Sequence, residues 1–229
     1  MTQTEMMVYL FVLLPSIILS VWASANVNST YKKYSKVRSM SGLTANDAVR
    51  RILDSNGLKN VRIEHVSGNL TDHYDPKANV IRLSDATDGS NSAAAIGVAA
   101  HEAGHAVQHA VGYTPIKIRM ALVPVCNIGS NLAIPLILMS FLFGIPSLAY
   151  VGIIAFATAT LFQLVTLPVE FDASRRAIAI LENGYMSGDD LRASKKVLRA
   201  AALTYVASLA VSLANLLRLV VMVSGRRRD

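Results

Sequence analysis

The amino-acid sequence predicts a mostly α-helical membrane protein, with about four transmembrane helices and a small α+β part. Of its 229 residues, 52% are hydrophobic and only 16% are charged. Three stretches contain no charged residue, and the last continues as an apolar run to Val223: residues 6–31, 120–169 and 200–217. A transmembrane helix needs about 20 apolar residues. A His-Glu-x-x-His motif in an apolar helical run, beside a short predicted sheet, indicates the α+β part.

Residues 1–31 are predicted to form an N-terminal transmembrane anchor, with the span itself at about 6–23. Ala23-Ser24-Ala25 resembles the cleavage site of a secretory signal. The basic n-region of such a signal is missing, since the only charge before the span is that of Glu5. We therefore interpret the span as a retained anchor, which Pro15 can kink. The basic residues 31–38 read as a linker facing water or lipid headgroups.

Residues 32–119 are predicted to form a catalytic α+β part. Thr44, with Asp47 three residues later, is expected to cap an amphipathic helix over 44–56. Segments 61–66 and 79–83 alternate like half-buried strands, and a turn is expected at 72–76. Val80–Leu83 is our candidate for an edge strand that takes substrate in extended form. Ser90 or Asn91 is expected to cap the motif helix, which ends near Gly112.

The uncharged stretch 120–169 is too long for one span and is predicted to be a helical hairpin. Gly144-Ile145-Pro146 near its middle supplies the turn. Residues 170–199 are expected to form a second catalytic segment, helical to about Asn183 with Gly184 as its cap. Residues 200–229 are expected to form a C-terminal transmembrane helix with a basic tail.

The motif His101-Glu102-Ala103-Gly104-His105 predicts a metal site. Residues four apart on a helix lie only about 40° apart around its axis, so two imidazoles can bind one ion from the same face. Glu102 is placed to act as general base toward a water that zinc activates. Because the flanking residues are small and apolar, the buried polar side chains of this motif need partners.

A catalytic zinc site needs a third protein ligand, and Glu170 is our candidate. It follows an apolar span directly and is expected on the same side of the membrane as the motif helix. Asp172 is the alternative ligand, although two residues on it faces away from Glu170 on a helix. Asp172 can instead form a salt bridge with Arg175 or Arg176, or hydrogen-bond to a metal ligand and so orient it.

Two other histidines, His73 and His109, are candidates for supporting the metal ligands or contacting the substrate. His109 continues the helical spacing, but at about 12 Å along the axis from His101 it is too far to share the ion. We expect His109 at the surface or in a substrate cleft. His73 can either stabilise the transition state or satisfy a turn.

The formal charge of +7 raises the question of nucleic acid, but no aromatic-interleaved basic patch or nucleic-acid motif is present in the sequence. Basic residues flank the apolar stretches instead, which favours a lipid bilayer as partner. The single cysteine, Cys126, allows no intrachain disulfide and reads as core filler.

Basic residues beside the spans also predict orientation. Clusters at 32–38, 117–119 and 175–176 place the metal site at the cytoplasmic face, with the N-terminus and hairpin tip outside. Arg226–Arg228 would then lie outside, against the rule, unless the last helix does not fully cross. We expect the three clusters that favour a cytoplasmic metal site to outweigh the single opposing cluster at Arg226–Arg228.

The chain resembles the bacterial YugP-like neutral zinc metallopeptidases of the membrane. The resemblance covers most of the chain and lies in residues 70–76, 80–84, 99–108, 167–174 and 197–206. It implies a zincin-like, gluzincin-like peptidase whose third zinc ligand is Glu170. The membrane proteases of FtsH type share His-Glu-Ala-Gly-His but need an ATPase phosphate loop, which is missing from this sequence. The HtpX type has an aspartate where this chain has Ser174.

The sequence therefore predicts a membrane-bound zinc metalloendopeptidase with one Zn²⁺ per chain, in the plasma membrane of a bacterium. Its substrate is expected to be a peptide or an unfolded or membrane protein. The competing hypothesis is a catalytically inactive zinc-binding scaffold or chaperone-like quality-control factor. Glu102 favours the enzyme, because a scaffold has no use for a base. Oligomeric state and specificity are not encoded in any motif.

Overall fold

The computed structural model describes residues 3–225, which fall into two compact units. The first unit contains the residues up to Ser24, residues 117–167 and the residues from Thr204 onward. The second contains Ala25–Ile116 and Pro168–Leu203. Both units are mostly helical, and the second also holds the sheet.

The protein is a membrane protein of mostly α-helical structure, as the sequence predicts. Among residues 3–225, four helical stretches are long and apolar enough to cross a bilayer: Gln3–Tyr34, Thr114–Phe143, Pro146–Glu182 and Gly188–Gly225. The first comprises α1 (Gln3–Val8), η1 (Tyr9–Leu13) and α2 (Leu14–Tyr34). The other three are α5, α6 and α7. Helix α2 continues through much of the stretch interpreted from sequence as a linker.

The first span contains a π-helical turn, η1, just before Pro15. The Leu14 backbone N–H donates to the Tyr9 carbonyl, five residues back. Proline has no N–H to donate within a helix, and its ring crowds the carbonyl of the preceding turn. Widening that turn by one residue relieves the crowding without ending the helix.

Helices α5 and α6 form the predicted hairpin, with Gly144 at φ +67° in the turn. The two helices approach closely at two glycines. A Cβ at Gly129 would lie 2.4 Å from the Thr158 Oγ1, and one at Gly152 would lie 2.6 Å from the Ile137 Cγ1. Small residues at such positions let transmembrane helices pack backbone to backbone.

The second unit begins with α3 (Ala45–Ser55) and reaches the motif on α4 (Ala93–Ala110). The predicted capping box of α3 is confirmed, since the Thr44 and Asp47 side chains each accept from the other's backbone N–H. The predicted cap of α4 is wrong by one or two residues. Ser92 occupies that position, and its Oγ accepts from Ala95 N at 3.2 Å.

The sheet has three strands within the described residues: β1 (Arg62–Val66), β2 (His73–Asp75) and β3 (Val80–Ser84). Their order is β1-β3-β2, with β1 parallel and β2 antiparallel to β3. Strand β2 was predicted as a turn, because three residues are too few to show alternation. Val80–Leu83 is not an edge strand, since β3 pairs on both sides. Strand β2 is one of the two edges.

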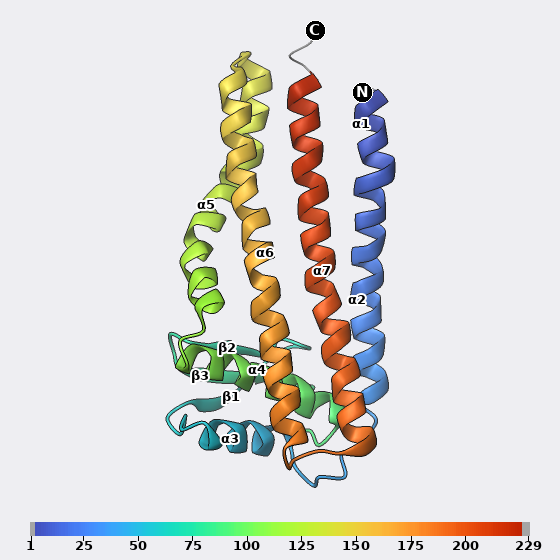
Figure 1. Ribbon diagram of the computed structural model, residues 1–229, viewed down its shortest axis with the longest axis vertical. Helices are drawn as coiled ribbons and strands as arrows, with labels where there is room; N and C mark the ends of the chain where they lie inside the picture. The colour runs from blue at the N-terminus through green and yellow to red at the C-terminus, as the bar shows by residue number, and fades with distance from the viewer. Residues whose placement is uncertain (1–2, 226–229) are drawn as a thin grey trace. The chain divides into compact units, whose positions relative to one another are not determined.

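One hydrophobic core joins these elements within the second unit. Its buried side chains come from α3, β3, α4, the end of α6 and the start of α7, for example Ile52, Leu83, Ile96, Leu181 and Leu198. Figure 1 shows the strands, α3 and α4 gathered around these parts of α6 and α7. The core therefore fixes α4 and the last turns of α6 in one body.

The segment from residue 170, expected to be helical to about Asn183, is helical to Glu182 and is followed by Gly184 with φ +126°. Helix α7 (Gly188–Gly225) then runs without a break. Near its start the buried Asp190 accepts hydrogen bonds from the Ser39 hydroxyl and the Met40 backbone N–H. This carboxylate ties the segment before α3 to α7.

Candidate metal centre

Helix α4 presents His101 and His105 on the same face, as four-residue spacing requires. Their rings meet edge to face with centroids 4.7 Å apart. The rest of the helix is built of small residues, and 14 of its 18 residues are buried. The two imidazoles are therefore carried by a helix that is packed against other parts of the protein along most of its length.

Glu170 reaches the two histidines from α6, and its carboxylate is only 2% exposed. This approach depends on Gly104, which lies between the two histidines in sequence. A Cβ at Gly104 would lie 2.6 Å from the Ala173 carbonyl oxygen on α6. Only glycine allows the two helices to come this close.

The three side chains have the geometry of a zinc site. The Glu170 Oε2 lies 3.2 Å from the His101 Nε2 and 3.6 Å from the His105 Nε2. Ligand atoms about 2.0–2.2 Å from a tetrahedral zinc ion are about 3.4 Å apart. One ligand atom from each residue lies within 4.8 Å of the others. Two imidazole nitrogens and a carboxylate oxygen are also donors that suit zinc.

The Nδ1 atom of each histidine makes a hydrogen bond on the side of the ring away from Glu170. The His105 Nδ1 lies 3.0 Å from the Gln108 Oε1, and the His101 Nδ1 lies 3.1 Å from the Ser174 Oγ. Both Nε2 atoms are thereby turned toward Glu170. Outer hydrogen bonds of this kind orient metal-binding histidines and fix which nitrogen is free.

Glu102 is buried beside this cluster, and its Oε2 accepts a hydrogen bond of 3.0 Å from the Tyr74 backbone N–H on β2. Burial raises the pKa of Glu102, while the neighbouring His101 and His105 act in the opposite direction. A carboxylate with a raised pKa is a better proton acceptor near neutral pH.

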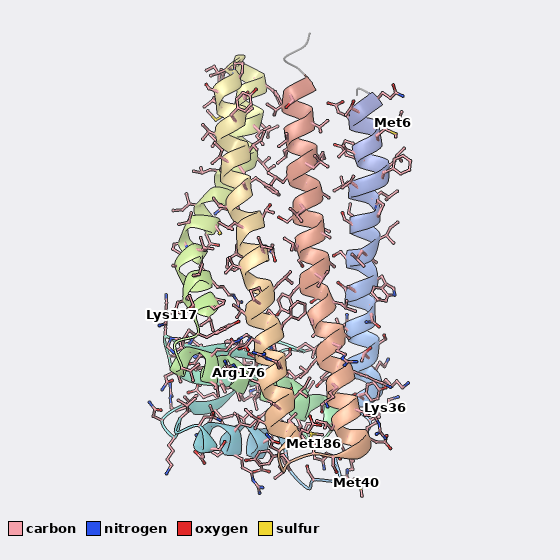
Figure 2. All side chains as sticks on the ribbon, viewed as in Figure 1. Met6, Lys36, Met40, Lys117, Arg176 and Met186 are labelled. Atoms are coloured by element: carbon pink, nitrogen blue, oxygen red, sulfur yellow. The ribbon has the colours of Figure 1, made fainter. Side chains whose placement is uncertain are left out.

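Three other residues weighed from the sequence lie outside the cluster. The Asp172 carboxylate is bonded to Gln108, Arg175 and Arg176, and Figure 2 labels Arg176 on α6. His73 is exposed on β2, with its Nδ1 on the Thr71 carbonyl at 2.8 Å. His109 is exposed and packs edge to face on Tyr74.

Sequence reasoning assigned no role to Gln108, Ser174, Gly104 or the Tyr74 amide. Gln108 follows His105 by three residues and Ser174 follows Glu170 by four, so helical spacing was the available signal for both. The closeness of α6 at Gly104 depends on tertiary structure. A backbone amide such as that of Tyr74 leaves no trace in a side-chain pattern.

Residues 9–224 match a protein family described as "Putative neutral zinc metallopeptidase". The chain belongs to this family. It is also 46% identical over 222 residues to the "Putative membrane protease YugP" of Bacillus subtilis, covering 96% of this chain and 99% of that protein. No solved structure matches the sequence.

Family membership agrees with the donor set and the apolar helices. The chain is a membrane-associated member of a zinc metallopeptidase family, which implies peptide substrates and a bilayer. The roles of individual residues rest on the geometry given above, because family membership does not assign them.

Replacing Gly104 with alanine is expected to weaken zinc binding on the order of 10–100-fold, since the new Cβ pushes α6 and Glu170 outward. The measurement is a zinc titration against a competing chelator. Gly97→Ala is the control, because its Cβ would lie 3.0 Å from the Ser194 Cβ on α7 instead. Equal zinc affinities in the two folded variants would contradict the close-approach argument.

Glu170→Ala should strip zinc or greatly weaken its binding, because it removes one of the three candidate ligand atoms. Asp172→Ala should leave a site that still fills with stoichiometric zinc. Metal content after gel filtration distinguishes the two variants. The reverse pattern would make Asp172 the ligand.

Proposed function

We propose that this protein is a membrane-bound zinc metalloendopeptidase that holds one Zn²⁺ through His101, His105 and Glu170. The observation that carries the proposal is the triad of His101, His105 and Glu170, of which the last two are buried, with the buried Glu102 beside it. A structural zinc site usually has four protein ligands, whereas a catalytic site has three and leaves a position for water. A catalytic zinc site needs three ligand side chains and a neighbouring carboxylate, and the proposed site has both.

Zinc, when bound, acidifies water and polarises the carbonyl of a peptide bond. Glu102 accepts the proton of the attacking water on its carboxylate. It then passes this proton to the departing amine as the peptide bond breaks. The Tyr74 amide keeps one carboxylate oxygen fixed during these transfers, and burial keeps bulk water from competing for the proton.

Strand β2 is our proposed docking edge for the substrate. The Tyr74 N–H is directed at Glu102 and not at β3, so the outer edge of β2 runs beside the base. In an antiparallel ladder the N–H and C=O of one residue point to the same side. An extended peptide that adds to this edge would reach the metal site with its backbone aligned. Unfolded or membrane proteins offer such segments.

The bacterial plasma membrane is the proposed location, with the site at the cytoplasmic face. Basic clusters next to three span ends support this orientation: Lys32, Lys33, Lys36, Arg38, Lys117, Arg119, Arg175 and Arg176. The opposing cluster Arg226–Arg228 lies outside the described residues. The related Bacillus protein is named a membrane protease, which fits this location.

Glu102→Gln tests the proposed function directly. The amide cannot accept the proton, so cleavage of an unfolded protein substrate should be lost while zinc content stays near stoichiometric. Cleavage is followed by electrophoresis and zinc by elemental analysis. If the unsubstituted protein cleaves nothing in a broad peptide library, the scaffold hypothesis replaces the enzyme.

Orientation is tested by cysteine labelling in intact cells, in a Cys126→Ala background. Lys36→Cys should react with a membrane-impermeant reagent only after the cells are opened. Ile145→Cys in the hairpin turn is the matched control and should react from outside. Labelling of Lys36→Cys in intact cells would refute the cytoplasmic assignment.

A further inference from the structure

Gln108 is a fully buried amide that the proposed chemistry does not use. It lies on α4 one turn after His105, with an exposed fraction of 0%. A buried amide must satisfy both its oxygen and its nitrogen. Its Oε1 faces the His105 Nδ1 at 3.0 Å, and its Nε2 faces α6.

Two groups on α6 decide which way this amide points. The Gln108 Nε2 lies 2.8 Å from the Val169 carbonyl oxygen and 2.9 Å from the Asp172 Oδ2. A carbonyl can only accept a hydrogen bond. The Asp172 carboxylate, held by the guanidinium groups of Arg175 and Arg176, also only accepts. The amide nitrogen therefore faces α6, and the amide oxygen must face His105.

The amide oxygen of Gln108 can only accept a hydrogen bond, so the His105 Nδ1 that faces it must be the donor and carries the proton. The Nε2 of the same ring is then left with a lone pair directed at the triad. His101 differs, because the Ser174 hydroxyl can donate or accept and does not select a tautomer. The hydrogen bond at Nδ1 therefore selects the tautomer of His105 but not that of His101.

We propose that Gln108 is a positioning residue that presets His105 for metal binding, with Asp172 and Val169 fixing the orientation of its amide. This inference rests on the proposed zinc site but not on peptidase activity. It also gives Asp172 a defined task. Asp172 acts on His105 through the amide of Gln108.

Gln108→Met is the first test. Methionine fills nearly the same volume but leaves the His105 Nδ1 without an acceptor. Zinc affinity, measured by chelator competition on the full-length protein in detergent, should fall by about 10–100-fold. The visible spectrum of the Co²⁺-loaded variant should also change, because the His105 ring is no longer held in one orientation.

Ser194→Ala is the control for loss of a buried hydrogen bond as such. Ser194 is also fully buried, and its Oγ donates to the Ala93 carbonyl at the other end of α4. This variant should lose stability without a change in zinc affinity or Co²⁺ spectrum. Equal zinc affinities in Gln108→Met and Ser194→Ala would overturn the proposal.

A pair of variants at Asp172 keeps the test decisive if Gln108→Met does not fold. The Asp172 Oδ2 accepts hydrogen bonds from both Gln108 and Arg176, whereas the Oδ1 accepts one from the exposed Arg175. Asp172→Asn can place its single oxygen at the Oδ2 position and should bind zinc like the unsubstituted protein. Asp172→Ala cannot, and its affinity should fall about tenfold while stoichiometric zinc still fills the site. Indistinguishable affinities in the two variants would overturn the proposal.

These measurements separate the inference from the proposed function. Zinc affinity and the Co²⁺ spectrum are read without any substrate. A protein that binds zinc as described but cleaves nothing refutes the enzyme and leaves the role of Gln108 standing. A protease whose zinc affinity does not respond to Gln108→Met refutes only the positioning role.

Discussion

The contact between the backbones of α4 and α6 at Gly104 is the constraint on which the site depends. One helix can offer two histidines to an ion, but the proposed third ligand lies 69 residues after His101. A carboxylate on a second helix reaches those histidines only if the helix axes come very close. The glycine between the two histidines, set against the Ala173 carbonyl, supplies that closeness.

The same closeness organises the polar groups around the triad. Once α6 lies against α4, Ser174 reaches His101 and Asp172 reaches Gln108, one helical turn beyond His105. Gln108 and Asp172 are buried, so each would be costly without its partner. The hydrogen bonds between α4 and α6 therefore depend on the close packing of the two helices, and they stabilise that packing in turn.

The sequence predicted the features that depend on local pattern. Hydropathy located the four spans, and the residues at Thr44, Gly144 and Gly184 correctly marked a helix start, a turn and a helix end. These signals work because capping and left-handed turns are decided by a few neighbouring residues. Helical spacing selected His101 and His105, and the position of Glu170 directly after an apolar span selected the third residue that the structure brings together with them.

The features that the sequence did not predict depend on tertiary contacts. Strand β2 exists because three residues pair with β3 and the Tyr74 backbone N–H donates to Glu102, which no periodicity reveals. Strand order could not be read either, so Val80–Leu83 was taken for an edge. The cap of α4 was predicted at Ser90 or Asn91 instead of Ser92, because several adjacent polar residues can each serve as a cap. The identity of the capping residue then depends on the path of the backbone.

The separation of the ligands along the chain has a consequence for biosynthesis. The ribosome completes the two histidines of α4 long before it reaches Glu170, and the whole hairpin is made in between. A nascent chain that ends within the hairpin holds two of the proposed ligands and the proposed base but cannot complete the proposed three-ligand site. On this proposal, zinc binding is delayed until the third span has been translated. A truncated product left in the bilayer by stalled synthesis would lack the complete triad.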